Sequence, residues 1–119
     1  MSKAAVKALS ESLSYSLRAT SITVNLLVPG YTFTKLTAGG SIEQKEKPAP
    51  AWTCDQVADE LFRRMDNEFY IICPDNDVTE KLDMARMAWT AGDILQKRAP
   101  LSRWRPEFKD EFEKHIRDY

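Results

Sequence analysis

The stretch Ile22-Thr-Val-Asn-Leu-Leu-Val28, followed by Pro29-Gly-Tyr-Thr-Phe-Thr34, decides the fold that the sequence predicts. Ile, Val and Leu fill most of the first segment, as in strands that a parallel sheet buries on both faces. Pro29 and Gly30 then predict a tight turn, because proline fixes φ and glycine tolerates positive φ. The sequence therefore predicts a buried strand over 22–28 that ends at this turn.

Upstream of this strand, the sequence predicts a helix from Ser2 to Leu17. Ala5, Leu9, Leu13 and Leu17 recur at every fourth position, which places them on one face of a helix. We expect this apolar stripe to be buried against a partner surface.

Downstream of the turn, residues Tyr31–Ala51 predict a mobile loop, because they carry glycines, charges and prolines without apolar periodicity. Thr53 and Gln56 then form the pattern of a capping box and predict the start of a second helix. An apolar face follows in this helix, consisting of Val57, Ala58, Leu61, Phe62 and Met65. Phe69–Cys73 predicts a second buried strand, closed by Pro74-Asp-Asn-Asp77.

The last part of the chain predicts two further helices. Apolar residues have helical spacing over Val78–Leu95, although Gly92 weakens the end of this segment, and again over Pro106–Ile116. Trp104, between two arginines, either contacts a partner or pins its loop to its own domain, and we favour the second. His115 has charged neighbours and is expected to be solvated.

Strands that alternate with helices indicate an α/β fold, and two strands can be only part of such a sheet. We therefore expect residues 1–75 to form the C-terminal half of a doubly wound, Rossmann-like parallel sheet, and residues 76–119 to form a helical C-terminal extension. No Gly-rich turn for a cofactor pyrophosphate occurs in the sequence.

Composition excludes several classes of protein. A net charge of −1 gives no broad attraction to nucleic acid or to an acidic membrane surface, so neither partner is expected. Cys54 and Cys73 lack the spacing of a zinc site or a disulfide framework, so no metal is expected and both thiols are predicted to be reduced. Without a signal peptide or a membrane-spanning stretch, the predicted location is the cytoplasm.

Lys3, the strand and the Pro-Gly turn together resemble the second half of a short-chain dehydrogenase/reductase, over roughly the first 75 residues of the chain. The resemblance implies that Lys3 is catalytic, hydrogen-bonds the nicotinamide ribose of NAD or NADP and lowers the pKa of a catalytic tyrosine. In the family this tyrosine precedes the lysine by one helical turn, and that position lies upstream of Met1. Taken alone, Lys3 would be interpreted as an ordinary solvated lysine in a first helical turn, and the downstream match favours the family role instead.

The same resemblance implies cofactor contacts at the turn. Pro29 and Gly30 would let the backbone approach the nicotinamide, Thr32 would pair with the carboxamide through its main chain, and Thr34 would offer its hydroxyl to the amide or phosphates. The alternative is a plain turn with exposed threonines.

The function that the resemblance implies is NAD(P)-dependent interconversion of an alcohol and a carbonyl compound. Because the catalytic tyrosine and the Gly-rich turn are absent, we expect this chain to be inactive alone. Two alternatives remain. One is a non-catalytic subunit that docks on a full-length paralogue through the stripe of Ala5, Leu9, Leu13 and Leu17, and the other is a complete enzyme whose start is misassigned. The resemblance thus implies an alcohol or carbonyl compound as the substrate of the parent family. It also implies that the chain associates with copies of itself or with a paralogous subunit.

Overall fold

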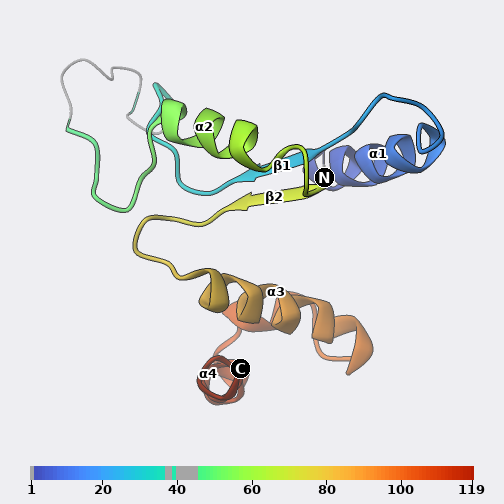
Figure 1. Ribbon diagram of the computed structural model, residues 1–119. Helices are drawn as coiled ribbons and strands as arrows, with labels where there is room; N and C mark the ends of the chain where they lie inside the picture. The colour runs from blue at the N-terminus through green and yellow to red at the C-terminus, as the bar shows by residue number, and fades with distance from the viewer. Residues whose placement is uncertain (1, 37–38, 40–45) are drawn as a thin grey trace. The chain divides into compact units, whose positions relative to one another are not determined.

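The computed structural model describes residues 2–36, 39 and 46–119, and the chain divides into two compact units, Met1–Asn76 and Asp77–Tyr119. In the first unit, α1 (Ser2–Ser16) precedes β1 (Leu26–Pro29), and α2 (Cys54–Arg64) precedes β2 (Tyr70–Cys73) (Figure 1). The second unit contains α3 (Glu80–Leu95), the 3₁₀ turns η1 (Ser102–Trp104) and η2 (Pro106–Phe108), and α4 (Lys109–Asp118).

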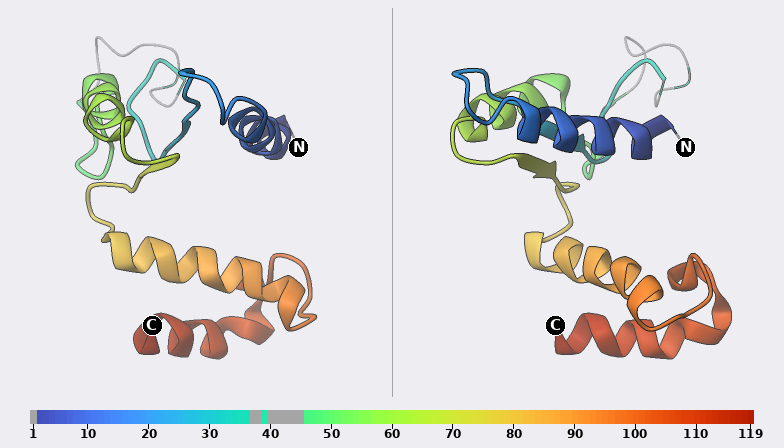
Figure 2. Two further views of the ribbon diagram at one scale, coloured as in Figure 1. Left: turned by 45° about the vertical axis from the view of Figure 1, so that its right-hand side comes forward. Right: turned by 90° about the vertical axis from the view of Figure 1, so that its right-hand side faces the viewer.

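Within the described residues, β1 and β2 form a two-stranded parallel sheet, with Leu26 opposite Tyr70 and Pro29 opposite Cys73. The crossover between the strands contains α2, so a β-α-β unit confirms the α/β class. Ile71 is fully buried, and the Arg64 guanidinium of α2 donates to the Ile72 carbonyl at 2.9 Å. Figure 2 shows α1 and α2 on opposite sides of the strand pair.

The prediction of a strand over 22–28, buried on both faces, is wrong in length and burial. β1 is confined to Leu26–Pro29, and Ile22 and Val28 are 60% and 40% exposed. Ile22 precedes the strand, and Val28 lies within it on a sheet of only two described strands. Strands as short as β1 and β2 do not form a stable sheet as a pair.

The apolar stripe of α1 is also not buried as predicted. α1 has no buried residue, and Leu9 and Leu13 are 60% and 43% exposed. A polar edge of the helix faces the sheet instead, because the Tyr70 hydroxyl of β2 donates to Glu11 Oε2 at 2.7 Å. The apolar face, including Val6 at 48%, is therefore exposed in this chain.

The predicted capping box at the start of α2 is confirmed. The Thr53 hydroxyl accepts from the Gln56 amide at 3.1 Å, and the Thr53 amide donates to the Gln56 side chain at 2.8 Å. These bonds give partners to two backbone N–H groups, those of Thr53 and Gln56, which have no carbonyl to bond at the start of a helix. Val57 of the predicted apolar face is buried, whereas Phe62 remains 69% exposed.

A buried polar network joins α3 to η1 in the second unit. Ser102 is fully buried, accepts from the Trp89 indole N–H at 2.8 Å and donates its hydroxyl to Asp93. Asp93 also accepts from Arg98, whose guanidinium lies 3.8 Å above the Trp89 ring and donates to the Trp89 carbonyl. Gly92 leaves room for this guanidinium, because a Cβ there would lie 2.8 Å from its Nη2.

Two predictions for the second unit are wrong. His115 is not solvated: it is half-buried, its Nε2 lies 2.8 Å from the Ala85 carbonyl, and its ring packs on Trp89. Trp104 does not pin its loop, because its side chain is 72% exposed and contacts the Arg103 guanidinium at 4.5 Å. In the part of the chain that the structure describes, no helix is long and apolar enough to cross a membrane.

Candidate functional site at the carboxyl edge of the strands

The turn after β1 lies against the segment after β2, because both strands end at the same edge of the sheet. Gly30 sits at the contact: a Cβ on this residue would lie 2.6 Å from Asp75 Oδ1 and 2.8 Å from the Cys73 carbonyl. We expected glycine here for its positive φ, yet among the described glycines only Gly39 has one. Gly30 is instead required by the close approach of two backbone segments.

Asp75 and Asn76 hold this edge together, and sequence reasoning missed both. The Tyr31 amide donates to Asp75 Oδ1 at 2.6 Å, which fastens the turn after β1. The Asn76 side-chain amide donates to the carbonyls of Ala49 and Ala51, at 3.2 and 3.0 Å. The signal was present in Pro74-Asp-Asn-Asp77, because Asx residues directly after a strand commonly bond neighbouring backbone.

Thr32 continues the strand geometry past the turn. It forms an isolated parallel bridge with Trp52, closed by the Phe33 amide to the Trp52 carbonyl at 2.8 Å and the Trp52 amide to the Tyr31 carbonyl at 2.9 Å. Thr32 Oγ1 donates to the Gly30 carbonyl at 3.2 Å. Both Thr32 and Thr34 are half-buried.

Pro29, Gly30, Thr32 and Thr34 thus lie together in one segment, but the structure does not bring Lys3 to them. Lys3 occupies the first turn of α1 and is exposed. Among the described hydrogen bonds and ion pairs, none joins Lys3 to the turn. The loop predicted as mobile over Tyr31–Ala51 falls partly outside the described residues, at 37, 38 and 40–45.

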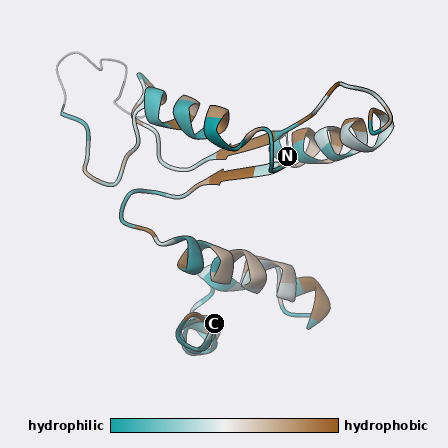
Figure 3. Cartoon of the chain, viewed as in Figure 1, coloured by the Kyte–Doolittle hydropathy of each residue, from teal (hydrophilic) through white to brown (hydrophobic). Residues whose placement is uncertain are grey.

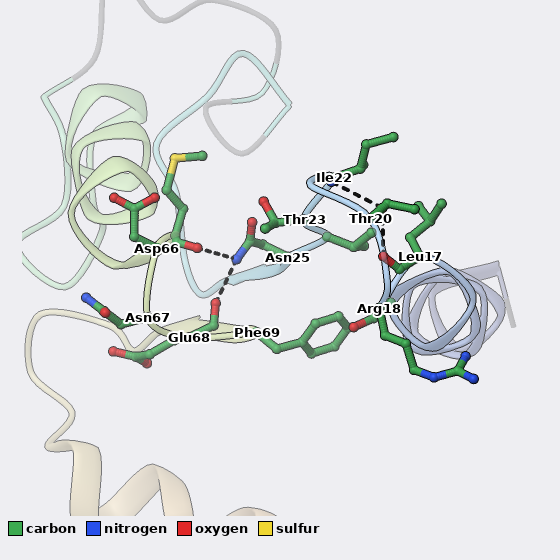
Figure 4. A pocket seen from close by; sticks show the side chains of 13 residues that line it. Leu17, Arg18, Thr20, Ile22, Thr23, Asn25, Asp66, Asn67, Glu68 and Phe69 are labelled. Atoms are coloured by element: carbon green, nitrogen blue, oxygen red, sulfur yellow. Dashed lines mark hydrogen bonds between the residues drawn. The ribbon is translucent and has the colours of Figure 1, made fainter.

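A cavity of about 340 Å³ lies at the opposite, amino edge of the strands rather than at the predicted cofactor turn (Figure 4). Its lining is mostly polar and comes from the segments that precede β1 and β2. Asn25 spans them, since its Nδ2 donates to the carbonyls of Met65 and Glu68 at 2.9 and 2.7 Å. These bonds tie the end of α2 to the start of β1, which is a structural role.

The charged and sulfur groups of the first unit are stabilising rather than reactive. Burial raises the pKa of the Cys73 thiol, so it remains protonated at neutral pH. The bond from Arg63 lowers the pKa of Glu60, and the bond from Arg64 lowers that of Glu68, which keeps both carboxylates charged. Both cysteines are free thiols. In the described segments, no group of His, Cys, Asp and Glu could hold a metal ion.

No family model, curated protein or solved structure matches this chain.

Proposed function

We propose that this chain supplies the nicotinamide side of a dinucleotide-binding sheet of the short-chain dehydrogenase/reductase type, with NAD or NADP as cofactor. The observation that carries the proposal is the turn at the carboxyl edge of a parallel β-α-β unit, where Gly30 lies against Asp75. Ligands of open α/β sheets bind outside this edge. The resemblance adds the parent activity, interconversion of an alcohol and a carbonyl compound.

Each candidate residue has a role in this proposal. Pro29 and Gly30 bring the backbone close to the nicotinamide, Thr32 offers its main chain to the carboxamide, and Thr34 offers its hydroxyl. Lys3 would bond the nicotinamide ribose and favour the phenolate of a tyrosine one helical turn earlier. This tyrosine and the turn that holds the pyrophosphate are outside the sequence of this chain, so we expect no turnover by the chain alone.

The open edge of β1 supports a larger sheet. The unpaired N–H and C=O groups on a strand edge can hydrogen-bond to a further strand. An isolated pair of short strands is only marginally stable in water. Helices on both sides of the strand pair (Figure 2) support the proposal that the unit belongs to a doubly wound sheet.

Binding of the two halves of the cofactor tests the proposal. We expect nicotinamide mononucleotide at millimolar concentration to shift the amide resonances of Gly30, Tyr31 and Thr32, and AMP to leave them unchanged, because the adenosine side belongs to the other half of such a sheet. Thr34→Val is expected to reduce the shifts, and Thr90→Val in α3 serves as the matched control. Equal shifts with both nucleotides, or none with either, would overturn the proposed half-site.

A second candidate function is a non-catalytic subunit that docks on a full-length paralogue. The exposed apolar face of α1, with Val6, Leu9 and Leu13 at 48%, 60% and 43% exposure, favours it. Contiguous exposed apolar surface commonly marks a protein–protein contact.

The intact and native masses of the endogenous protein separate these functions. A species heavier than 13.6 kDa with peptides that map upstream would support a complete oxidoreductase. A 13.6 kDa chain in complex with a larger dehydrogenase subunit would support the docking subunit. A free 13.6 kDa monomer would contradict both.

A further inference from the structure

Residues 94–105, which we call the tip, comprise the end of α3, the turn that follows it and η1. The tip exposes large apolar side chains of the second unit. Ile94 and Leu95 are both 83% exposed, Leu101 is 69% exposed and Trp104 is 72% exposed. Figure 3 shows the apolar colour at the C-terminal end of α3. The second unit thus leaves four large apolar side chains of one short segment exposed, and we call them the apolar patch.

The tip is held rigidly in this conformation. Lys97 and Leu101 both have positive φ, 54° and 56°, which is unfavourable for residues other than glycine. The buried bonds of Asp93 to Arg98 and Ser102 fix the backbone on either side of the strained residues. The fold therefore maintains backbone strain in a segment whose apolar side chains lie in water.

Cations surround the apolar patch. Residues 94–105 contain Lys97, Arg98, Arg103 and Arg105 and no acidic residue. Arg98 pairs with Asp93 and has a side chain only 8% exposed, and Arg105 pairs with Glu107 at 3.7 Å. Lys97 is exposed, and the half-buried Arg103 lies over the Trp104 ring. The tip is thus locally basic, although the whole chain has a net charge of −1.

We infer that the tip docks on an anionic lipid surface. Trp and Leu side chains insert at the boundary between headgroups and acyl chains, and Lys and Arg beside them bind the phosphates. Contact of this kind needs no membrane-spanning helix.

Vesicle binding by the full chain tests this inference. We expect co-sedimentation with phosphatidylcholine vesicles that contain about a third phosphatidylserine to exceed that with pure phosphatidylcholine about tenfold, and to fall when NaCl rises to about 0.5 M. Trp104→Ala and Leu101→Ser should each weaken binding at least about fivefold. Leu36→Ser, at a leucine that is 91% exposed in the first unit, is the matched control and should bind as the wild type.

Quenching by brominated lipids gives a readout that does not depend on affinity. Fluorescence of a Trp52→Phe variant should be quenched by anionic vesicles, and adding Trp104→Phe should abolish this quenching, because the remaining Trp89 side chain is only 5% exposed. Equal binding to both vesicle types, equal effects of Leu101→Ser and Leu36→Ser, or no loss of quenching when Trp104→Phe is added would each overturn the inference. Binding to poly-glutamate without binding to vesicles would also overturn it and assign the tip to an acidic protein.

Discussion

At the residue scale, Gly30 and Asp75 determine how closely the two strand ends approach. Gly30 has no room for a Cβ beside Asp75 Oδ1 and the Cys73 carbonyl. The Asp75 carboxylate accepts a hydrogen bond from the backbone amide of Tyr31, the residue that follows Gly30. A single small residue thus permits the contact, and a single carboxylate holds it. Both lie where the proposed nicotinamide contacts begin.

Substitution of Gly30 tests this arrangement. We expect Gly30→Ala to lower the free energy of unfolding by about 1–3 kcal/mol, because the Cys73 carbonyl is backbone and cannot move aside easily. Urea denaturation measures the loss. Asp75→Ala alone should also destabilise the unit, but in the double variant the two losses should not add, since one clash disappears with the carboxylate. Full additivity would contradict the proposed contact.

Ser102 is the centre of the buried network in the second unit. Ser102→Ala removes the acceptor of the Trp89 indole N–H and a donor to Asp93, and leaves both groups buried without this partner. We expect a loss of about 1–3 kcal/mol in the free energy of unfolding. Ser16→Ala, at an exposed position that ends α1, is the control and should stay within about 0.5 kcal/mol of the wild type. Equal effects would show that the network contributes nothing.

At the element scale, α1 is attached to the sheet by few polar contacts, of which the bond from Tyr70 to Glu11 is one. Bonds from Lys7 and Tyr70 lower the pKa of Glu11. A carboxyl group whose pKa is lowered in the folded state stabilises it above its ordinary pKa, and this contribution is lost as the pH falls through the lowered value. The attachment of α1 should therefore weaken in acid, below about pH 4.

Hydrogen exchange of the α1 amides measures this attachment. We expect Tyr70→Phe to speed amide exchange in α1 at neutral pH. In the wild type, exchange in α1 should become faster still in acid, and Tyr70→Phe should abolish most of this further increase. Tyr15→Phe, at a tyrosine that is 68% exposed on α1 itself, should change neither. Identical pH profiles for the wild type and Tyr70→Phe would show that the bond does not hold α1.

The elements themselves were largely predictable, because they depend on local signals. The capping box at Thr53 and the run Phe69–Cys73 each specify an element within a few residues, and both occur in the structure. Burial was not predictable, since it depends on what covers a surface. The stripe of Leu9 and Leu13 has helical spacing, yet it is exposed, and the contact of α1 with the sheet is instead the hydrogen bond from Tyr70 to Glu11.

The candidate site was predictable only in part for the same reason. The segment from Pro29 to Thr34 is contiguous, so its residues necessarily lie together. Asp75 reaches Tyr31 through the pairing of β1 with β2, a contact between residues far apart in sequence that spacing alone does not reveal. Likewise, His115 was expected in solvent, and only the packing of α4 on α3 accounts for its bond to Ala85.

At the scale of the whole molecule, the first unit leaves the apolar face of α1 exposed and, within the described residues, the outer edges of β1 and β2 without a partner strand. We expect the isolated chain to associate at concentrations of about 10 µM, because exposed apolar faces and open strand edges pair with other molecules. Sedimentation velocity should show species larger than 13.6 kDa. Leu9→Glu with Leu13→Glu should shift the distribution toward monomer, whereas Leu36→Glu should not. A wild-type chain that stays monomeric and unfolds in one sharp, cooperative transition would show that the unit is self-sufficient, and would count against its proposed place in a larger sheet.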